Sequence, residues 1–248
     1  MSGDAEKEIY ASGMRGMVGF ICALLLLVLT ACSSKSKETP APVRPPFTPT
    51  STAPPSKIME VKIFTVIGDS FTIGTGGSAW PSLIQVQLRH DGIATAAKVA
   101  ADGNAGYTMP GSQGRMTFGE LAARSVQPHD DLVIYFGSTN DGYPDGLNVQ
   151  AATAAVNDTF AKTRATAPTA KLLVIGPASP DPAPFTVELN DILRDQATRV
   201  GATFVDALGE KWLQDDAALV GPDRVHPSDA GQRYLADKIE PLIAAQLH

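Results

Sequence analysis

Short apolar runs alternate with longer amphipathic segments from about residue 62 to the C-terminus. The first run, at residues 63–67, is rich in branched side chains and ends at Gly68. This pattern is typical of a strand buried on both faces of a parallel sheet. Four later runs have the same character. The five expected strands cover residues 63–67, 93–100, 131–136, 171–175 and 203–205.

The amphipathic segments predict helices. In residues 149–167, Ala152, Val156 and Phe160 recur at helical spacing, and the segment stops at Pro168. The expected helices cover residues 79–90, 117–124, 149–167, 185–200 and, after a capping Ser228, a segment that runs to about residue 247. Alternation of strand and helix predicts parallel strands, right-handed crossovers and helices on both faces of the sheet. We therefore expect an α/β fold, a three-layer α/β/α sandwich with one core and no internal repeat.

The first 31 residues have the features of a targeting signal. An apolar segment at residues 17–29 follows Arg15 and precedes Cys32. It is too short for an ordinary spanning helix and has the length of a signal-peptide core. Residues 29–32, Leu-Thr-Ala-Cys, resemble the lipobox of bacterial lipoproteins, in which cleavage leaves the cysteine as a lipid-carrying N-terminus. We expect a signal peptide at residues 1–31 and an extracytoplasmic protein attached to the bacterial cell membrane through lipidated Cys32. The alternative is a plain secretory signal with an incidental cysteine.

A linker at residues 32–58 separates this signal from the folded part. Proline, serine and threonine dominate it, and almost none of its residues is apolar. Such a segment cannot bury enough apolar surface to offset the entropy lost on ordering. We expect a disordered spacer that holds a domain at residues 59–248 away from the membrane.

Composition and charge narrow the classes of function. The chain has 248 residues, of which 44% are hydrophobic and 19% charged, as in ordinary globular proteins. The formal net charge of −6 argues against binding to duplex nucleic acid. Cys22 and Cys32 both precede the expected domain, which excludes a disulfide framework, a thiolate metal site and a cysteine nucleophile within it. The sequence does not fix the oligomeric state, and a monomer is the expectation.

Ser70 is the first candidate for chemistry. It follows Gly68 and Asp69 directly after the first expected strand. In open α/β sheets, ligands bind outside the carboxyl ends of the strands, so a small nucleophile is well placed there. Taken alone, the tripeptide is more typical of an ordinary turn.

His226 is the histidine best placed to act as a general base. His248 is the C-terminal residue, His90 lies at an exposed helix end, and His129 lies at the amino end of a strand. His226 lies in a loop that enters the last helix, three residues after Asp223. This acid is the nearest one able to orient the ring and to stabilise an imidazolium. The alternative is a solvated helix entry, and no second histidine is near enough for a metal site.

Two loop residues are candidates for stabilising an oxyanion. Gly106 and Asn140 follow the second and third expected strands, which should flank the first. Backbone N–H groups at glycines and side-chain amides are the usual donors of an oxyanion hole. Each residue is also explained, by itself, as an ordinary turn residue.

Four short segments together resemble the four blocks of the SGNH (GDSL) hydrolases, in the same order. They are Gly-Asp-Ser at 68–70, Asn-Ala-Gly-Tyr-Thr at 104–108, Gly-Ser-Thr-Asn-Asp at 137–141 and Asp-Arg-Val-His at 223–226. The resemblance spans residues 62–248 and implies a mostly parallel, flavodoxin-like sheet of about five strands.

The resemblance also implies roles for individual residues. Ser70 would be the nucleophile, His226 the general base and Asp223 the acid that orients it. The oxyanion hole would consist of the Ser70 and Gly106 amides and the Asn140 side chain.

The third block departs from the family pattern. It usually reads Gly-x-Asn-Asp, whereas two residues separate Gly137 from Asn140. Either Ser138 takes the place of the glycine or the loop bulges by one residue, and the two alternatives place Asn140 differently.

The resemblance implies a serine esterase that acts on an acyl ester without cofactor or metal. The family includes lipases, thioesterases and carbohydrate deacetylases, and a site outside the membrane makes cell-envelope lipids and O-acylated glycans the expected substrates. Tyr107 and Tyr143 are candidates for lining an acyl or sugar pocket, although aromatic residues in loops more often cap a core. The alternatives are a surface binding lipoprotein without turnover and an acyltransferase.

Overall fold

The computed structural model describes residues 60–248. The predicted signal peptide, the predicted lipidation of Cys32 and the predicted linker at residues 32–58 lie outside the described residues, and they stay predictions. Within residues 60–248, no helix is both long and apolar enough to cross a lipid bilayer.

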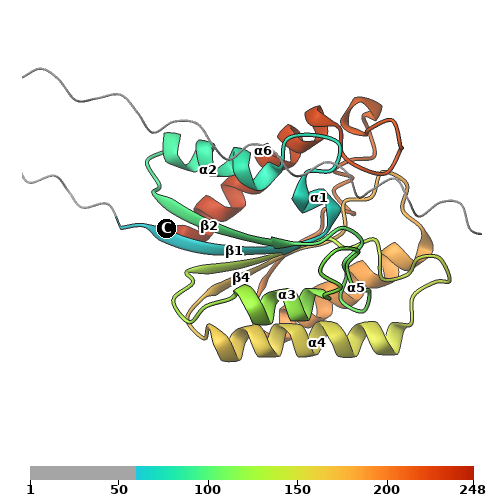
Figure 1. Cartoon of the computed structure of the whole chain (residues 1–248), viewed down its shortest axis with the longest axis horizontal. Coiled ribbons are helices and arrows are strands. Elements are labelled where there is room, and N and C mark those ends of the chain that lie inside the picture. Colours follow the sequence, from blue (N-terminus) through green and yellow to red (C-terminus); the bar gives the residue numbers. More distant parts are fainter. Residues whose placement is uncertain (1–59) are drawn as a thin grey trace, which may run out of the picture. The chain divides into compact units, whose positions relative to one another are not determined.

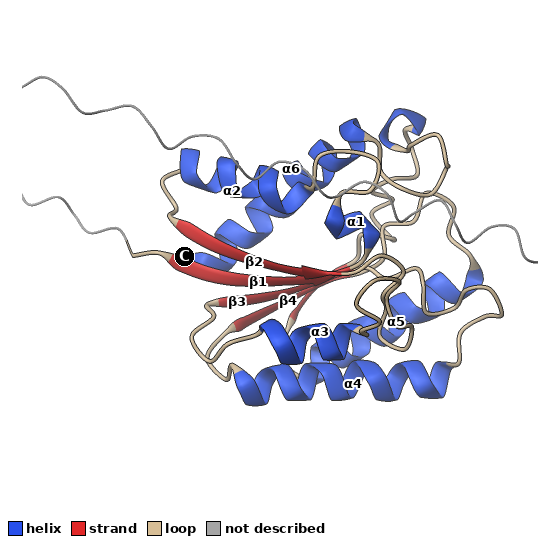
Figure 2. Cartoon of the chain, in the orientation of Figure 1, coloured by secondary structure: helices blue, strands red, loops and turns tan. Residues whose placement is uncertain are grey.

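A parallel sheet of five strands forms the centre of this part of the chain (Figure 2). The strands are β1 (Lys62–Gly68), β2 (Thr95–Ala101), β3 (Leu132–Phe136), β4 (Lys171–Ile175) and β5 (Thr203–Val205). Their order is β2-β1-β3-β4-β5, and every neighbouring pair is parallel. β1 lies between β2 and β3, as the sequence predicts, so the loops after these three strands meet at one edge of the sheet.

Helices cover both faces of the sheet (Figure 1). One face carries α1 (Ser70–Ile73), α2 (Trp80–His90) and α6 (Asp229–Leu247), and the other carries α3 (Phe118–Ser125), α4 (Val149–Thr166) and α5 (Pro184–Arg199). The five longer helices match the predicted ranges to within one residue, and the predicted three-layer α/β/α sandwich is confirmed. The sequence does not predict α1 or the 3₁₀ turn η1 (Ala217–Leu219), because both are too short to show a helical period.

Alternate strand residues fill two separate cores. Val66 and Ile134 belong to the core under α2 and α6, whereas Ile67 and Val133 belong to the core on the side of α3, α4 and α5. All residues of β3 are fully buried, as expected for a central strand of a sheet covered on both faces. Burial of each such side chain contributes about 1.5–3 kcal/mol. The sheet is therefore a rigid support for the loops at its carboxyl edge.

Candidate active site

Ser70 is the first residue of α1, two positions after the end of β1. The Asp69 carboxylate accepts a hydrogen bond from the Phe71 N–H at 2.9 Å and so caps this short helix. Gly74 ends it with a φ of 89°, in the left-handed region that favours glycine. The turn leaves Ser70 half-buried, with its Oγ 3.0 Å from Nε2 of His226.

His226 connects Ser70 to Asp223. Nδ1 of His226 lies 2.6 Å from Oδ2 of Asp223, and the other carboxylate oxygen accepts the N–H groups of Val225 and His226, both at 3.0 Å. The hydrogen bond with His226, followed by the two backbone donors, lowers the pKa of Asp223 to about 2. An ionised Asp223 favours the tautomer with its proton on Nδ1, which leaves Nε2 able to accept the Ser70 hydroxyl proton.

The loop after α1 packs directly against the segment around His226. A Cβ on Gly76 would lie only 2.6 Å from the Pro227 carbonyl oxygen, and the φ of +94° at Gly76 also favours glycine. Close by, the Ser78 N–H donates to the Asp229 carboxylate at 2.9 Å. The backbone of the loop that follows Ser70 and α1 therefore packs against the backbone of the segment that contains His226.

Gln232 of α6 fastens the same segments from inside the protein. Its side chain is fully buried, accepts from the Trp80 N–H at 3.0 Å and donates to the Phe71 carbonyl oxygen at 3.1 Å. The Phe71 ring packs against the His226 ring, with the centroids 5.7 Å apart. Helices α1, α2 and α6 thus meet at one side chain. Sequence reasoning missed Gln232, and the only signal for it is a polar residue among the buried positions of α6.

The third block, with two residues between Gly137 and Asn140, directly follows β3. Gly137 has a φ of +98°, and the fully buried Ser138 accepts the Asn140 N–H on its Oγ at 2.8 Å. The Asn140 side chain is directed toward Asp69 and Ala105. Its Nδ2 donates to the Ala105 carbonyl oxygen at 2.8 Å and to Oδ2 of Asp69 at 3.3 Å.

Gly106 lies in the neighbouring loop with its backbone groups engaged. Its N–H donates to the Met109 carbonyl oxygen, and its own carbonyl accepts the Phe118 N–H, both at 2.8 Å. Of the three predicted oxyanion donors, only the Ser70 N–H makes no hydrogen bond within residues 60–248. The structure therefore brings Ser70, Asn140 and the Gly106 loop together, while the Gly106 and Asn140 N–H groups have acceptors within the protein.

Asp69 is a buried carboxyl group that sequence reasoning treated only as part of a turn. Its side chain is 3% exposed, and burial raises its pKa from 3.8 to about 7, a shift to which the nearby Asp141 also contributes. The Phe71 N–H and the positive charge that His226 carries when protonated act in the opposite direction. An acid next to the candidate nucleophile therefore changes protonation near neutral pH.

The two predicted pocket tyrosines have different environments. Tyr107 is buried, and its ring contacts those of Phe118, Tyr135 and Phe160 in the core under α3 and α4. That burial separates Tyr107 from solvent, so its place is that of a core residue and not of a pocket wall. Tyr143, in contrast, is 71% exposed in the loop after β3, and its predicted contact with substrate stays a prediction.

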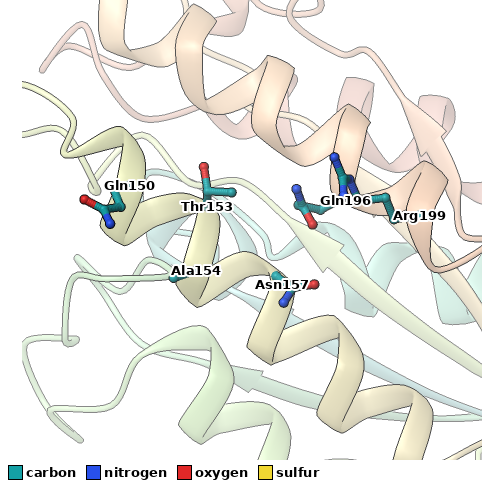
Figure 3. Close-up of a pocket in the computed structure, with 6 residues that line it drawn as sticks. All are labelled: Gln150, Thr153, Ala154, Asn157, Gln196 and Arg199. Carbon is teal, nitrogen blue, oxygen red and sulfur yellow. The ribbon is translucent and has the colours of Figure 1, made fainter.

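The remaining features of the described residues bear on metal binding and on other pockets. Within residues 60–248, no three side chains of His, Cys, Asp or Glu gather in a way that would hold a metal ion. A shallow hollow between α4 and α5 contains none of the predicted site residues (Figure 3). Its lining consists of Gln150, Thr153, Ala154, Asn157, Gln196 and Arg199.

Comparisons with a family model and with a curated relative both point to GDSL lipases. A model of the GDSL-like Lipase/Acylhydrolase family matches residues 66–234. A GDSL lipase of Mycobacterium tuberculosis is 45% identical over 190 residues, which are 73% of this chain and 81% of the relative.

Solved structures show the same fold at low sequence identity. TesA has a TM-score of 0.61 and is 20% identical, with 75% of this chain and 100% of TesA covered. A lipase/acylhydrolase from Enterococcus faecalis has a TM-score of 0.60 and is 16% identical, with 75% of this chain and 97% of that chain covered.

Proposed function

This chain belongs to the GDSL-like lipase/acylhydrolase family and is a carboxylic ester hydrolase, and we propose that it works as a serine esterase with a Ser70, His226 and Asp223 triad. The observation that carries the proposal is the continuous chain of contacts from the serine hydroxyl through the imidazole to the carboxylate, at 3.0 Å and 2.6 Å.

Acylation follows from this geometry. Nε2 of His226 takes the proton of the Ser70 hydroxyl while Oγ forms a bond to the ester carbonyl carbon. Asp223 stabilises the resulting imidazolium, since it is ionised at neutral pH. When the tetrahedral intermediate collapses, the bond to the alcohol oxygen breaks, the alcohol leaves with the proton from His226, and the acyl group stays on Ser70.

The negative charge that develops on the carbonyl oxygen needs donors at the same place. The Ser70 N–H supports this role, since it has no acceptor within the described residues. In our proposal the Asn140 amide and the Gly106 N–H complete the hole. Each of them would give up a hydrogen bond to its present acceptor within the protein and donate to the oxyanion instead. A preorganised donor is typically worth about 3 kcal/mol in the transition state, a value that applies directly to the Ser70 N–H, because the other two groups must first leave their present acceptors.

Deacylation repeats the same steps with water. Nε2 of His226 removes a proton from a water molecule, whose oxygen attacks the acyl carbon. The ester bond to Ser70 Oγ then breaks, and the proton returns from His226 to the serine. The cycle releases a carboxylic acid and regenerates the free enzyme.

Labelling with a fluorophosphonate probe tests this assignment. We expect wild-type protein to be labelled, and Ser70→Ala to lose both labelling and esterase activity. Ser82→Ala, a change at an exposed serine of α2, is the control and should leave both unchanged. Labelling and activity that persist in Ser70→Ala would remove Ser70 as the nucleophile.

The location of the enzyme is a second part of the proposal. A signal peptide followed by lipidated Cys32 would tether it to the membrane, where cell-envelope lipids and O-acylated glycans are its substrates. Cys32→Ser should abolish incorporation of labelled fatty acid and release the protein from the membrane fraction, whereas Cys22→Ser should do neither. Incorporation that survives in Cys32→Ser would reject the anchor.

Substrate class is tested with nitrophenyl esters of increasing chain length. A lipid substrate predicts that kcat/KM rises with acyl length, because each buried methylene contributes about 0.8 kcal/mol. Activity confined to the acetate ester would reject the lipid and favour O-acetylated glycans.

A further inference from the structure

Asp141 receives an unusual number of hydrogen bonds from a neighbouring loop. Its carboxylate accepts the N–H groups of three consecutive residues, Tyr107 at 3.0 Å, Thr108 at 2.5 Å and Met109 at 3.3 Å. The Thr108 hydroxyl donates as well, at 2.8 Å. The side chain is only 8% exposed, so these are the partners that compensate for its burial.

We propose that Asp141 is a positioning residue that fixes the Gly106 loop against Asn140 and thereby sets the geometry of the oxyanion hole. The inference rests on the proposed function, since it assigns a role at the same site. Asp141 itself does not need to touch the substrate.

Contacts on both sides of the Gly106 loop support this role. A Cβ on Gly106 would lie 2.5 Å from Oδ2 of Asp141, so the carboxylate lies directly against the glycine backbone. On the other side, Nδ2 of Asn140 holds the Ala105 carbonyl oxygen at 2.8 Å. Two adjacent residues of the loop after β3 therefore hold the loop after β2 at Ala105 and at residues 107–109, with Gly106 between the two attachments.

Only a carboxylate suits this arrangement. An ionised aspartate offers acceptors alone, and all four groups that face it are donors. In Asp141→Asn the side-chain NH₂ group would face at least one backbone N–H, and that donor would lose its partner. Charge-assisted bonds are also roughly twice as strong as neutral ones. The substitution should therefore loosen the loop while conserving the size of the side chain.

Asp102 provides a matched control in the same loop. It is also buried, at 4% exposed, and its carboxylate accepts the N–H groups of Gln113 at 3.0 Å and Gly114 at 2.6 Å. These contacts hold the far end of the glycine-rich loop and not the part that includes Gly106. Asp102→Asn should therefore lower stability without a selective effect on the oxyanion hole.

The experiment compares Asp141→Asn and Asp102→Asn in thermal stability, in kcat and KM for nitrophenyl acetate, and in inhibition by an arylboronic acid. The boronate forms a tetrahedral adduct on the serine and so reports on the hole. For Asp141→Asn we expect kcat to fall ~100-fold with KM nearly unchanged, and boronate affinity to fall in parallel. For Asp102→Asn we expect kcat and boronate affinity to stay within about threefold of wild type, even if its Tm is lower.

Several outcomes would reject the inference. Equal losses of kcat and boronate affinity in the two variants would mean that both aspartates only stabilise the fold. An unchanged kcat in Asp141→Asn would mean that Asp141 does not set the geometry of the hole, and a higher kcat would mean that its negative charge opposes the oxyanion. If Asp141→Asn does not fold, Thr108→Val can replace it, because it removes one donor to the carboxylate. We expect a smaller loss of kcat and of boronate affinity in this variant, and no loss would also count against the role of Asp141. A wild type that neither hydrolyses esters nor reacts with fluorophosphonate would instead reject the proposed function.

Discussion

Oγ of Ser70 lies 3.0 Å from Nε2 of His226, although 156 positions separate the two residues along the chain. The two belong to different parts of the fold, because one follows β1 and the other precedes α6. Their distance is maintained by the contacts beneath and beside them, principally the Gln232 side chain and the close approach at Gly76. Those contacts lead to the first two predictions.

Gln232→Leu should lower activity more than its effect on stability explains. The change removes partners from two buried backbone groups, which costs about 1–3 kcal/mol for each, and frees Phe71 to move with Ser70. A displacement of about 1 Å at Ser70, the proposed nucleophile, can reduce kcat ~100-fold. Steady-state kinetics at a temperature where the variant is fully folded measure the effect. Gln246→Leu, near the end of the same helix, is the control. A kcat unchanged in folded Gln232→Leu would argue against the positioning role.

Gly76→Ala should displace the histidine loop. The new methyl group would collide with the Pro227 carbonyl oxygen, so one of the two loops must move. Gly92→Ala separates this collision from backbone strain, because Gly92 also has a positive φ but nothing lies within 4 Å of its would-be Cβ. Both variants should lose about 1 kcal/mol of stability through strain. Only Gly76→Ala should also lose kcat, and similar kinetics of the two variants would contradict this.

Asp223→Asn tests the orientation of the imidazole. An asparagine cannot hold the proton on Nδ1 with an ionised acceptor, so the productive tautomer loses its support. We expect kcat/KM to fall on the order of 10³–10⁴-fold while Tm changes little. Asp216→Asn is the matched exposed acid, which caps the 3₁₀ turn η1 through the Ala218 N–H. Its kcat/KM should equal that of wild type, and a fall of less than tenfold in Asp223→Asn would point to another orienting group.

The fold could be predicted because its signals are local. The apolar run at residues 171–175 predicts a strand, and Ser228 predicts the start of a helix, from neighbouring residues alone. The structure has β4 and the N-cap of α6 at these positions. The site could be assembled in outline for a topological reason. When β1 lies between β2 and β3, the loops that carry Ser70, Gly106 and Asn140 necessarily meet at one edge.

The features that the sequence left open or did not reveal depend on how distant parts of the chain come together. The bonds of Gln232 span 152 and 161 positions, and no pattern near Gln232 predicts them. Tyr107 lies in a polar loop, yet its ring is buried because α3 and α4 cover it, which only the assembled fold decides. At Asn140 the hydrogen bond to Ser138 is local, but the full burial of Ser138 is decided by the assembled fold.

Asn140→Ala tests whether the Asn140 side chain serves as an oxyanion donor. If Asn140 supplies an oxyanion donor, its loss should lower kcat about 10²–10³-fold and leave KM nearly unchanged. Asn148→Ala is the control, because Asn148 caps α4 and its loss should cost about 1 kcal/mol of stability without affecting kcat. Comparable kcat values for wild type and Asn140→Ala would restrict the hole to backbone donors.

The buried Asp69 should make stability depend on pH. Its pKa is about 7 in the folded protein and near 3.8 in the unfolded chain, so between these values the folded state binds a proton that the unfolded state does not. This contribution stabilises the protein at low pH and is lost as the pH rises through about 7. Between pH 5 and pH 8, the free energy of unfolding should fall by about 2–3 kcal/mol more in wild type than in Asp69→Asn. Urea denaturation at both values measures it, and equal pH dependence of the two proteins would contradict the shift.

The direction of β1 has a practical consequence. The strand begins at Lys62 at the amino edge of the sheet and ends at Gly68, immediately before the loop that carries Ser70. Its length, seven residues at about 3.3 Å each, separates the two edges by roughly 23 Å. A bead, biotin or fusion partner joined ahead of residue 60 would be attached on the side away from Ser70. Immobilised enzyme prepared in that way should keep its substrate access, whereas coupling through loops at the carboxyl edge should block it.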